Sequence, residues 1–123
     1  IPGETEAQAI AELQSILDRL AASDKDFHAA VKSFFAREPF EVAAADPIVK
    51  EVQAAASHIL QHPIDPGGVS FWTDAALLAA SGIPTVVFGP IGAGAHAAEE
   101  WIDLRSAEQS ATIYAQTALA FCG

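Results

Sequence analysis

The sequence predicts an α/β fold, and three features of the chain carry that prediction. Stretches with apolar residues at three- and four-residue steps indicate amphipathic helices. The continuous apolar run at residues 85–88 indicates a strand that is covered on both faces, as in a parallel sheet. A glycine-rich loop follows this run. Helices that alternate with a buried strand are typical of an α/β domain.

The first predicted element is an amphipathic helix. Residues 1–4 predict a turn, and Thr5 is placed to cap a helix in which Gln8 completes a capping box. Apolar residues then recur on one face, at Ile10, Leu13, Leu17 and Leu20. We expect this helix to end near Ala22.

A strand and a domain boundary are expected next. The imperfect alternation over residues 27–36 predicts a strand, and Pro39 limits its continuation to an edge. The order of elements changes after this point, so we place a domain boundary at about residues 44–47. Residues 1–45 and 46–123 then form separate parts, and neither part has enough helices and strands to form a hydrophobic core alone.

The second part is predicted to begin with two helices. Asp46-Pro47 is a strong helix start, because Asp caps free amides and Pro gives up an amide that has no partner at this position. Residues 47–61 should be helical. Two Pro and two Gly break regular structure over residues 62–68. Thr73 then caps a short Ala/Leu helix that stops at Gly82.

The predicted strand at residues 84–88 and a final helix from about Ser106 complete the chain. We expect the strand to be parallel and buried, with residues 106–121 packed against it through a common face of Ala107, Ala111, Tyr114, Ala118 and Phe121. A single buried strand has two unpaired edges, so the chain should be marginally stable or associate with copies of itself.

The composition excludes several classes of protein. Hydrophobic residues make up 51% of the 123 residues and the net charge is −10, which is typical of a soluble globular protein. Six Lys and Arg against 16 Asp and Glu argue against a nucleic-acid partner. No apolar run approaches the roughly 20 residues of a membrane span. The one cysteine, Cys122, allows no internal disulfide, and without a signal-peptide pattern a cytoplasmic location is the default.

His96 is the histidine that most resembles a functional residue. It follows the predicted strand at residues 84–88, and ligands of open α/β sheets gather beyond the carboxyl ends of strands. The residues around it are small and leave its ring accessible; these are Gly94, Ala95, Ala97 and Ala98. Neutral imidazole is a common zinc ligand.

Several short motifs in this region occur in the order of a known family. They are Thr73-Asp74-Ala75, Gly82-Ile83-Pro84-Thr85, Gly89-Pro90, Ala95-His96 and Glu99-Glu100. This order resembles the C-terminal signature of the co-catalytic zinc aminoacylase and carboxypeptidase family, which includes acetylornithine deacetylase, succinyl-diaminopimelate desuccinylase and glutamate carboxypeptidase. Ile1-Pro2-Gly3-Glu4 looks like the end of a segment in the lid domain of that family.

The resemblance implies a fold. Residues 1–45 would be the end of an α+β lid, or dimerisation, domain. Residues 46–123 would be the C-terminal part of a three-layer αβα catalytic domain of the zinc-peptidase type. Because relatives often dimerise through the lid, the resemblance also implies a homodimer.

The resemblance further implies roles for individual residues. His96 would bind one of two zinc ions, although cobalt or manganese would also accept this ligand. Asp74, Glu99 and Glu100 would orient the ligand or the loop by hydrogen bonding. A structural role at the start of a helix is as compatible with the position of Asp74.

A substrate-side loop is also implied, formed by Gly89, Pro90 and Gly92, whose amides could face a carboxylate or an oxyanion. Ile91 departs from the family, since many relatives have another glycine there. The expected substrate is an N-acyl amino acid or a small peptide, and the residues that would select among substrates lie mostly outside this segment.

The chain lacks most of the family's active site. The upstream His-x-Asp motif, the bridging Asp and the Glu-Glu pair are not found, and catalytic zinc usually has three protein ligands. We therefore expect a fragment of an amidohydrolase that is inactive alone. The alternative is a short, non-catalytic relative that serves for protein association.

Two other interpretations of the polar residues are weaker. Ser70, Asp74 and His96 suggest a hydrolase triad, but the nucleophile elbow Gly-x-Ser-x-Gly is absent. The remaining histidines have no acidic or cysteine partners at ligand spacing, and we interpret them as surface or loop residues; they are His28, His58 and His62.

Overall fold

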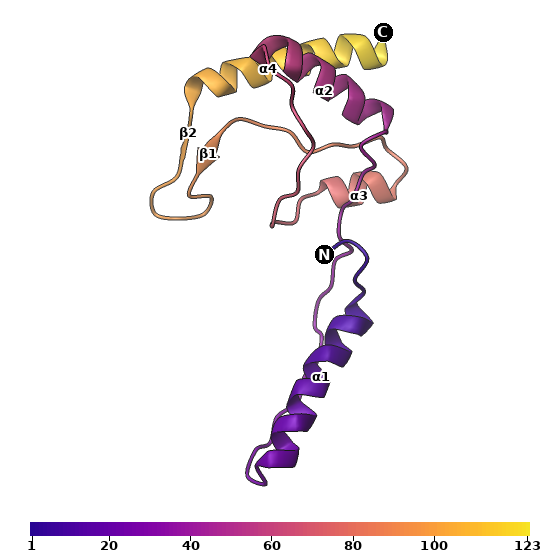
Figure 1. Cartoon of the computed structure of the whole chain (residues 1–123), viewed down its shortest axis with the longest axis vertical. Coiled ribbons are helices and arrows are strands. Elements are labelled where there is room, and N and C mark those ends of the chain that lie inside the picture. The colour runs from indigo at the N-terminus through magenta and orange to yellow at the C-terminus, as the bar shows by residue number, and fades with distance from the viewer. The chain divides into compact units, whose positions relative to one another are not determined.

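The computed structural model describes all residues from 1 to 123 (Figure 1). Its elements, in chain order, are α1 (Glu6–Ser23), α2 (Pro47–Leu60), α3 (Ala75–Ala80), β1 (Gly92–Ala93), β2 (Trp101–Ile102) and α4 (Leu104–Cys122). The chain divides into two compact units, Ile1–Glu41 and Val42–Gly123, whereas the sequence placed a boundary at about residues 44–47. No helix combines the length and the apolar character that crossing a membrane requires.

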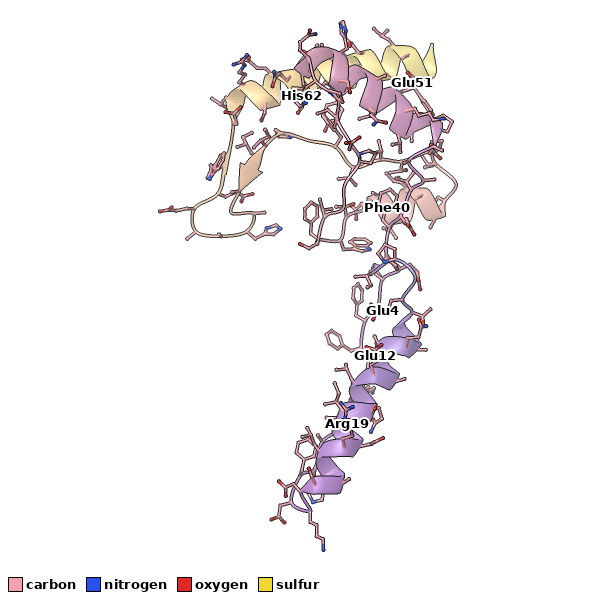
Figure 2. The ribbon with its side chains drawn as sticks, in the orientation of Figure 1. Glu4, Glu12, Arg19, Phe40, Glu51 and His62 are labelled. Carbon is pink, nitrogen blue, oxygen red and sulfur yellow. The ribbon has the colours of Figure 1, made fainter.

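Helix α1 forms the first unit together with an extended segment. The predicted capping box is present: the backbone amide of Gln8 donates to Thr5 Oγ1 over 3.3 Å, and the amide of Thr5 donates to Gln8 Oε1 over 2.8 Å. None of the side chains of α1 is buried, and Figure 2 shows Glu12 and Arg19 along the helix.

The predicted strand over residues 27–36 is wrong for this chain. These residues run back along α1 in an extended conformation (Figure 1), but they belong to no sheet. The physical reason is that no second extended segment lies beside them to complete a ladder of hydrogen bonds.

Helix α2 begins where the sequence predicts. Asp46 is its N-cap and accepts a hydrogen bond from the amide of Ile48 over 3.1 Å, and Pro47 is the first helical residue. The helix ends at Gln61, whose φ of 59° is left-handed. The chain then folds back along α2, because Ser57 Oγ accepts from the amide of Ile64 over 3.2 Å.

The core of the second unit lies between α2 and α4, which pack side by side (Figure 1). Its buried apolar side chains are Ala55, Ala56 and Ile113, and partly buried side chains surround them: Ile59, Leu60, Ile64 and Phe88. Ile113 is the largest fully buried side chain, with 1% of its surface exposed. A small core therefore depends on one large side chain from α4.

The predicted buried face of α4 is wrong. The residues of α4 that are buried are Ser106, Ser110, Ile113 and Thr117, whereas Tyr114 and Phe121 of the predicted face are exposed. Alpha-helical spacing alone does not decide which face is covered. Here the face of α4 that carries Ser110, Ile113 and Thr117 packs on α2, whereas Tyr114 of the predicted face contacts Phe88 in the loop before β1.

Helix α3 is short, as predicted. Thr73 Oγ1 accepts a hydrogen bond from the amide of Ala75 over 3.3 Å, while Asp74 occupies the N-cap position without a side-chain cap bond. The helix ends before Gly82, whose φ of 78° is left-handed. The helix therefore ends at the predicted glycine, while its N-cap is Asp74, one residue after the predicted cap Thr73.

The predicted parallel strand at residues 84–88 is also wrong for this chain. These residues belong to no strand, and the sheet of the structure is an antiparallel pair with the register Gly92↔Ile102 and Ala93↔Trp101. Phe88 does reach the core between α2 and α4. The segment passes the core in an extended form, but no neighbouring strand pairs with it.

Candidate functional site

His96 lies in the loop that joins β1 to β2. The amide of Ala97 donates to the carbonyl oxygen of Gly94 over 2.8 Å, which closes a four-residue turn with His96 in its third position. The φ of His96 is 65°, as a type II turn requires at that position. A left-handed conformation costs a non-glycine residue about 1–2 kcal/mol. The imidazole is exposed, at the tip of a hairpin.

Two glycines allow the arms of this hairpin to approach each other. A Cβ atom on Gly94 would lie 2.0 Å from the carbonyl oxygen of Glu99, and the φ of Gly94 is 77°. A Cβ atom on Gly92 would lie 2.5 Å from the carbonyl oxygen of Trp101. Only glycine is compatible with such approaches. These glycines therefore shape the backbone that carries His96.

The base of the hairpin is joined to the first turn of α4. Asp103 is the N-cap of α4, and its amide donates to the carbonyl oxygen of Ile91 over 2.8 Å. The amide of Ile91 donates to Ser106 Oγ over 2.9 Å. Both backbone polar groups of Ile91 are thus paired with α4 or its cap.

The loop before the hairpin contacts α4 at a second point. The Tyr114 hydroxyl donates a hydrogen bond to the carbonyl oxygen of Phe88. The two aromatic rings meet edge to face, with centroids 5.8 Å apart and an interplanar angle of 89°. Gly89 and Pro90, two of the predicted substrate-side residues, lie between this contact and Ile91.

The amides of this loop differ in their availability to a ligand. Pro90 has none, and the amide of Ile91 is bonded to Ser106. Opposite residues of an antiparallel ladder alternate between hydrogen-bonded and non-hydrogen-bonded pairs. The amide of Asp103 donates to Ile91, so the next pair, Gly92 and Ile102, is a non-hydrogen-bonded pair, and the Gly92 amide points away from β2. The amides of Gly89 and Gly92 are therefore the ones that remain for a ligand.

The predicted orienting carboxylates do not gather around His96 within this chain. Asp74, Glu99 and Glu100 are all exposed, and no group of three histidine, cysteine or acidic side chains could hold a metal ion. A single imidazole does not fit a catalytic zinc ion, which usually has three protein ligands. The residues of this chain alone therefore do not make the metal site.

The alternative sites find no structural support either. No hydrogen bond joins Ser70, Asp74 and His96, and Ser70 is exposed. The histidines interpreted as surface residues are exposed; these are His28, His58 and His62. His62 lies just beyond the end of α2 (Figure 2), with its Nδ1 3.0 Å from the carbonyl oxygen of Pro63.

A shallow hollow in the surface lies elsewhere, along α1. It is lined by Ala11, Glu12, Ser15, Ile16 and Arg19. It contains none of the predicted site residues and no nucleophile paired with a base. Its position on one face of a single helix gives no means of enclosing a substrate.

Sequence reasoning missed the residues of α4 that hold the loop. Ser106 was expected only to begin the final helix, and Tyr114 was assigned to its packing face. Asp is a preferred residue at the N-cap of a helix, so Asp103 could have been found. The contact of Tyr114 with Phe88 joins residues far apart in the chain, and no local pattern signals it.

The comparisons with known proteins give one match. The family model described as peptidase family M20/M25/M40 matches residues 3–120, which is nearly the whole chain and includes every predicted site residue. Neither the comparison with curated proteins nor the comparison with solved structures found a match.

Proposed function

This chain belongs to the peptidase family M20/M25/M40, and from that membership we propose that it is part of a metal-dependent hydrolase that cleaves the amide bond of N-acyl amino acids or small peptides. The observation that carries the proposal is the family match over residues 3–120, which spans the His96 hairpin and the loop before it. The coarser conclusion, a protein of a hydrolase family, rests on the match alone.

His96 is the metal ligand that we assign to this chain. Its imidazole is exposed at the tip of a hairpin, and neither ring nitrogen has a hydrogen-bond partner in the chain, so both remain accessible. We propose that the other ligands are supplied from outside residues 1–123, because no group of three histidine, cysteine or acidic side chains within these residues could hold a metal ion. Zinc is the metal we propose, with cobalt or manganese as substitutes. The 123 residues by themselves should be inactive.

The substrate-binding role falls to the loop before the hairpin. The amides of Gly89 and Gly92 are free of internal partners, and backbone amides are suitable donors to a carboxylate or to the oxyanion of a tetrahedral intermediate. Pro90 restricts the backbone between them. Glu99 and Glu100 lie in the same hairpin loop as His96 and would orient it once the remaining ligands are in place. Asp74 would act from the start of α3.

The family also suggests what covers the unpaired segments. We propose that residues 84–88 join a parallel sheet supplied by the rest of a three-layer αβα catalytic domain, and that Ile1–Glu41 is the end of a lid domain through which a homodimer forms. The extended conformation of residues 84–88, and of residues 27–36 in the first unit, supports this assignment, since an extended chain with unpaired edges is suited to sheet pairing. A cytoplasmic location is part of the same proposal.

The test of the proposal is the substitution His96→Ala in the full-length protein, with His58→Ala and His62→Ala as matched controls. Replacing a residue that only supports a ligand lowers metal affinity or activity by about 10–100-fold, so loss of a direct ligand should lower hydrolysis by more than about 100-fold. Metal content by elemental analysis and turnover of N-acetyl amino acids are the measurements. Wild-type metal content and turnover in His96→Ala would remove the ligand assignment.

A further inference from the structure

The hydroxyl of Ser106 joins three parts of the second unit. It accepts a hydrogen bond from the amide of Ile91 over 2.9 Å and donates one to the carbonyl oxygen of Asp103 over 2.8 Å. The amide of Ser106 in turn donates to the Asp103 carboxylate over 2.7 Å. Only 8% of the Ser106 surface is exposed. A buried hydroxyl with a donor and an acceptor role fixes the geometry of both partners.

Tyr114 holds the same loop from its other end. Its hydroxyl donates to the carbonyl oxygen of Phe88, and its ring meets the ring of Phe88 edge to face. Ser106 and Tyr114 lie about 12 Å apart along the helix axis at 1.5 Å per residue. Phe88 contacts Tyr114, and the later loop residue Ile91 contacts the earlier helix residue Ser106. The loop therefore runs along α4 antiparallel to it.

We propose that Ser106 and Tyr114 are positioning residues that hold the loop Phe88–Ile91 against α4, and so fix the Gly89 amide and the His96 hairpin relative to each other. The inference rests on the proposed function, because it takes this loop to be the one that binds the carboxylate of the substrate. Neither hydroxyl touches the substrate in this scheme. Each acts through the backbone of the loop.

The substitutions Ser106→Ala and Tyr114→Phe in the full-length protein test the proposal. Ser106→Ala removes the hydroxyl but keeps the Asp103 cap, and Tyr114→Phe keeps the ring contact with Phe88. Ser110→Ala is the matched control, because Ser110 is buried on the same helix, with 5% of its surface exposed, and forms no hydrogen bond with the loop. Far-UV circular dichroism checks that all three variants remain folded.

The first readout is hydrogen exchange of the Ile91 amide. Ser106→Ala should accelerate it about tenfold, because the amide loses its acceptor, whereas Ser110→Ala should leave it unchanged. Equal exchange in these two variants would overturn the proposal. This readout needs no enzymatic activity, so it tests the positioning role of Ser106 separately from the proposed function. Failure of the proposed function would appear as absent hydrolysis in the wild-type protein.

The second readout is the kinetics of N-acetyl amino acid hydrolysis. A loosened carboxylate-binding loop weakens ground state and transition state alike, so KM should rise about tenfold in Ser106→Ala and Tyr114→Phe while kcat stays close to wild type. Ser110→Ala should change neither constant. Unchanged KM in both loop variants, or a fall in kcat alone, would overturn the positioning role.

Discussion

Replacing Ile113 by alanine should remove the central contact between α2 and α4. Ile113 is 1% exposed and is the largest fully buried side chain. The substitution removes three carbon atoms, which at about 0.8 kcal/mol for each buried methylene group gives roughly 2.4 kcal/mol of lost transfer free energy. The cavity left behind adds to this, so we expect a loss of about 3–4 kcal/mol in the free energy of unfolding.

The assay is urea denaturation followed by far-UV circular dichroism. Leu119→Ala is the control on the same helix, since Leu119 is 77% exposed and its loss should change the free energy of unfolding by no more than about 0.5 kcal/mol. Ile113→Val should lie between the two, at about 0.5–1.5 kcal/mol. If Ile113→Ala costs less than about 1 kcal/mol, the two helices do not form the core of this unit.

Three further predictions concern the hairpin, a helix cap and association. Gly94→Ala should lower the free energy of unfolding by more than about 2 kcal/mol, because its Cβ would lie 2.0 Å from the Glu99 carbonyl oxygen. Gly82 has a similar φ but open space around it, so Gly82→Ala should lower this free energy by only about 1–2 kcal/mol. Equal decreases for the two variants in unfolding experiments would contradict the close approach at Gly94. Asp46→Ala should lower the free energy of unfolding by about 1 kcal/mol, because the hydrogen bond from the Ile48 amide is lost. Asp46→Asn should keep most of this stabilisation in the same measurement, since Asn is also a good N-cap residue. The 123-residue chain should associate with itself in analytical ultracentrifugation, because its extended segments have unpaired edges; a monomer with a cooperative melt would show that these segments need no partner.

Helix ends were predictable because their signals are local. The capping box of Thr5 and Gln8 and the start at Asp46-Pro47 each depend on side chains that bond to amides two or three residues away. Such bonds form whatever the rest of the molecule does. The family was predictable for a related reason, since short motifs in a fixed order are a property of the sequence itself.

The strands and the buried face of α4 were not predictable, because they depend on partners. Residues 84–88 have the composition of a buried strand, yet a strand also needs a neighbour, and none lies beside them in this chain. The buried face of α4 is the one with Ser110 and Ile113, and not the apolar face around Tyr114, because α2 covers the former. His96 was correctly expected in a glycine loop, but the hairpin beneath it depends on contacts that no spacing reveals.

The two helices that form the core bracket every residue assigned to the site. Packing of α2 on α4 closes residues 61–103 into a loop whose ends are fixed, and this loop carries the residues from Asp74 to Glu100. Closure entropy rises slowly with length, so doubling such a loop costs only about 0.6 kcal/mol. Insertions within the exposed residues 65–71 are thus inexpensive for the fold, whereas the contacts of Ile64, Phe88 and Ile91 fix the chain at other points of this loop. The length of the exposed part of this loop can therefore vary while the helix pair that closes the loop stays unchanged.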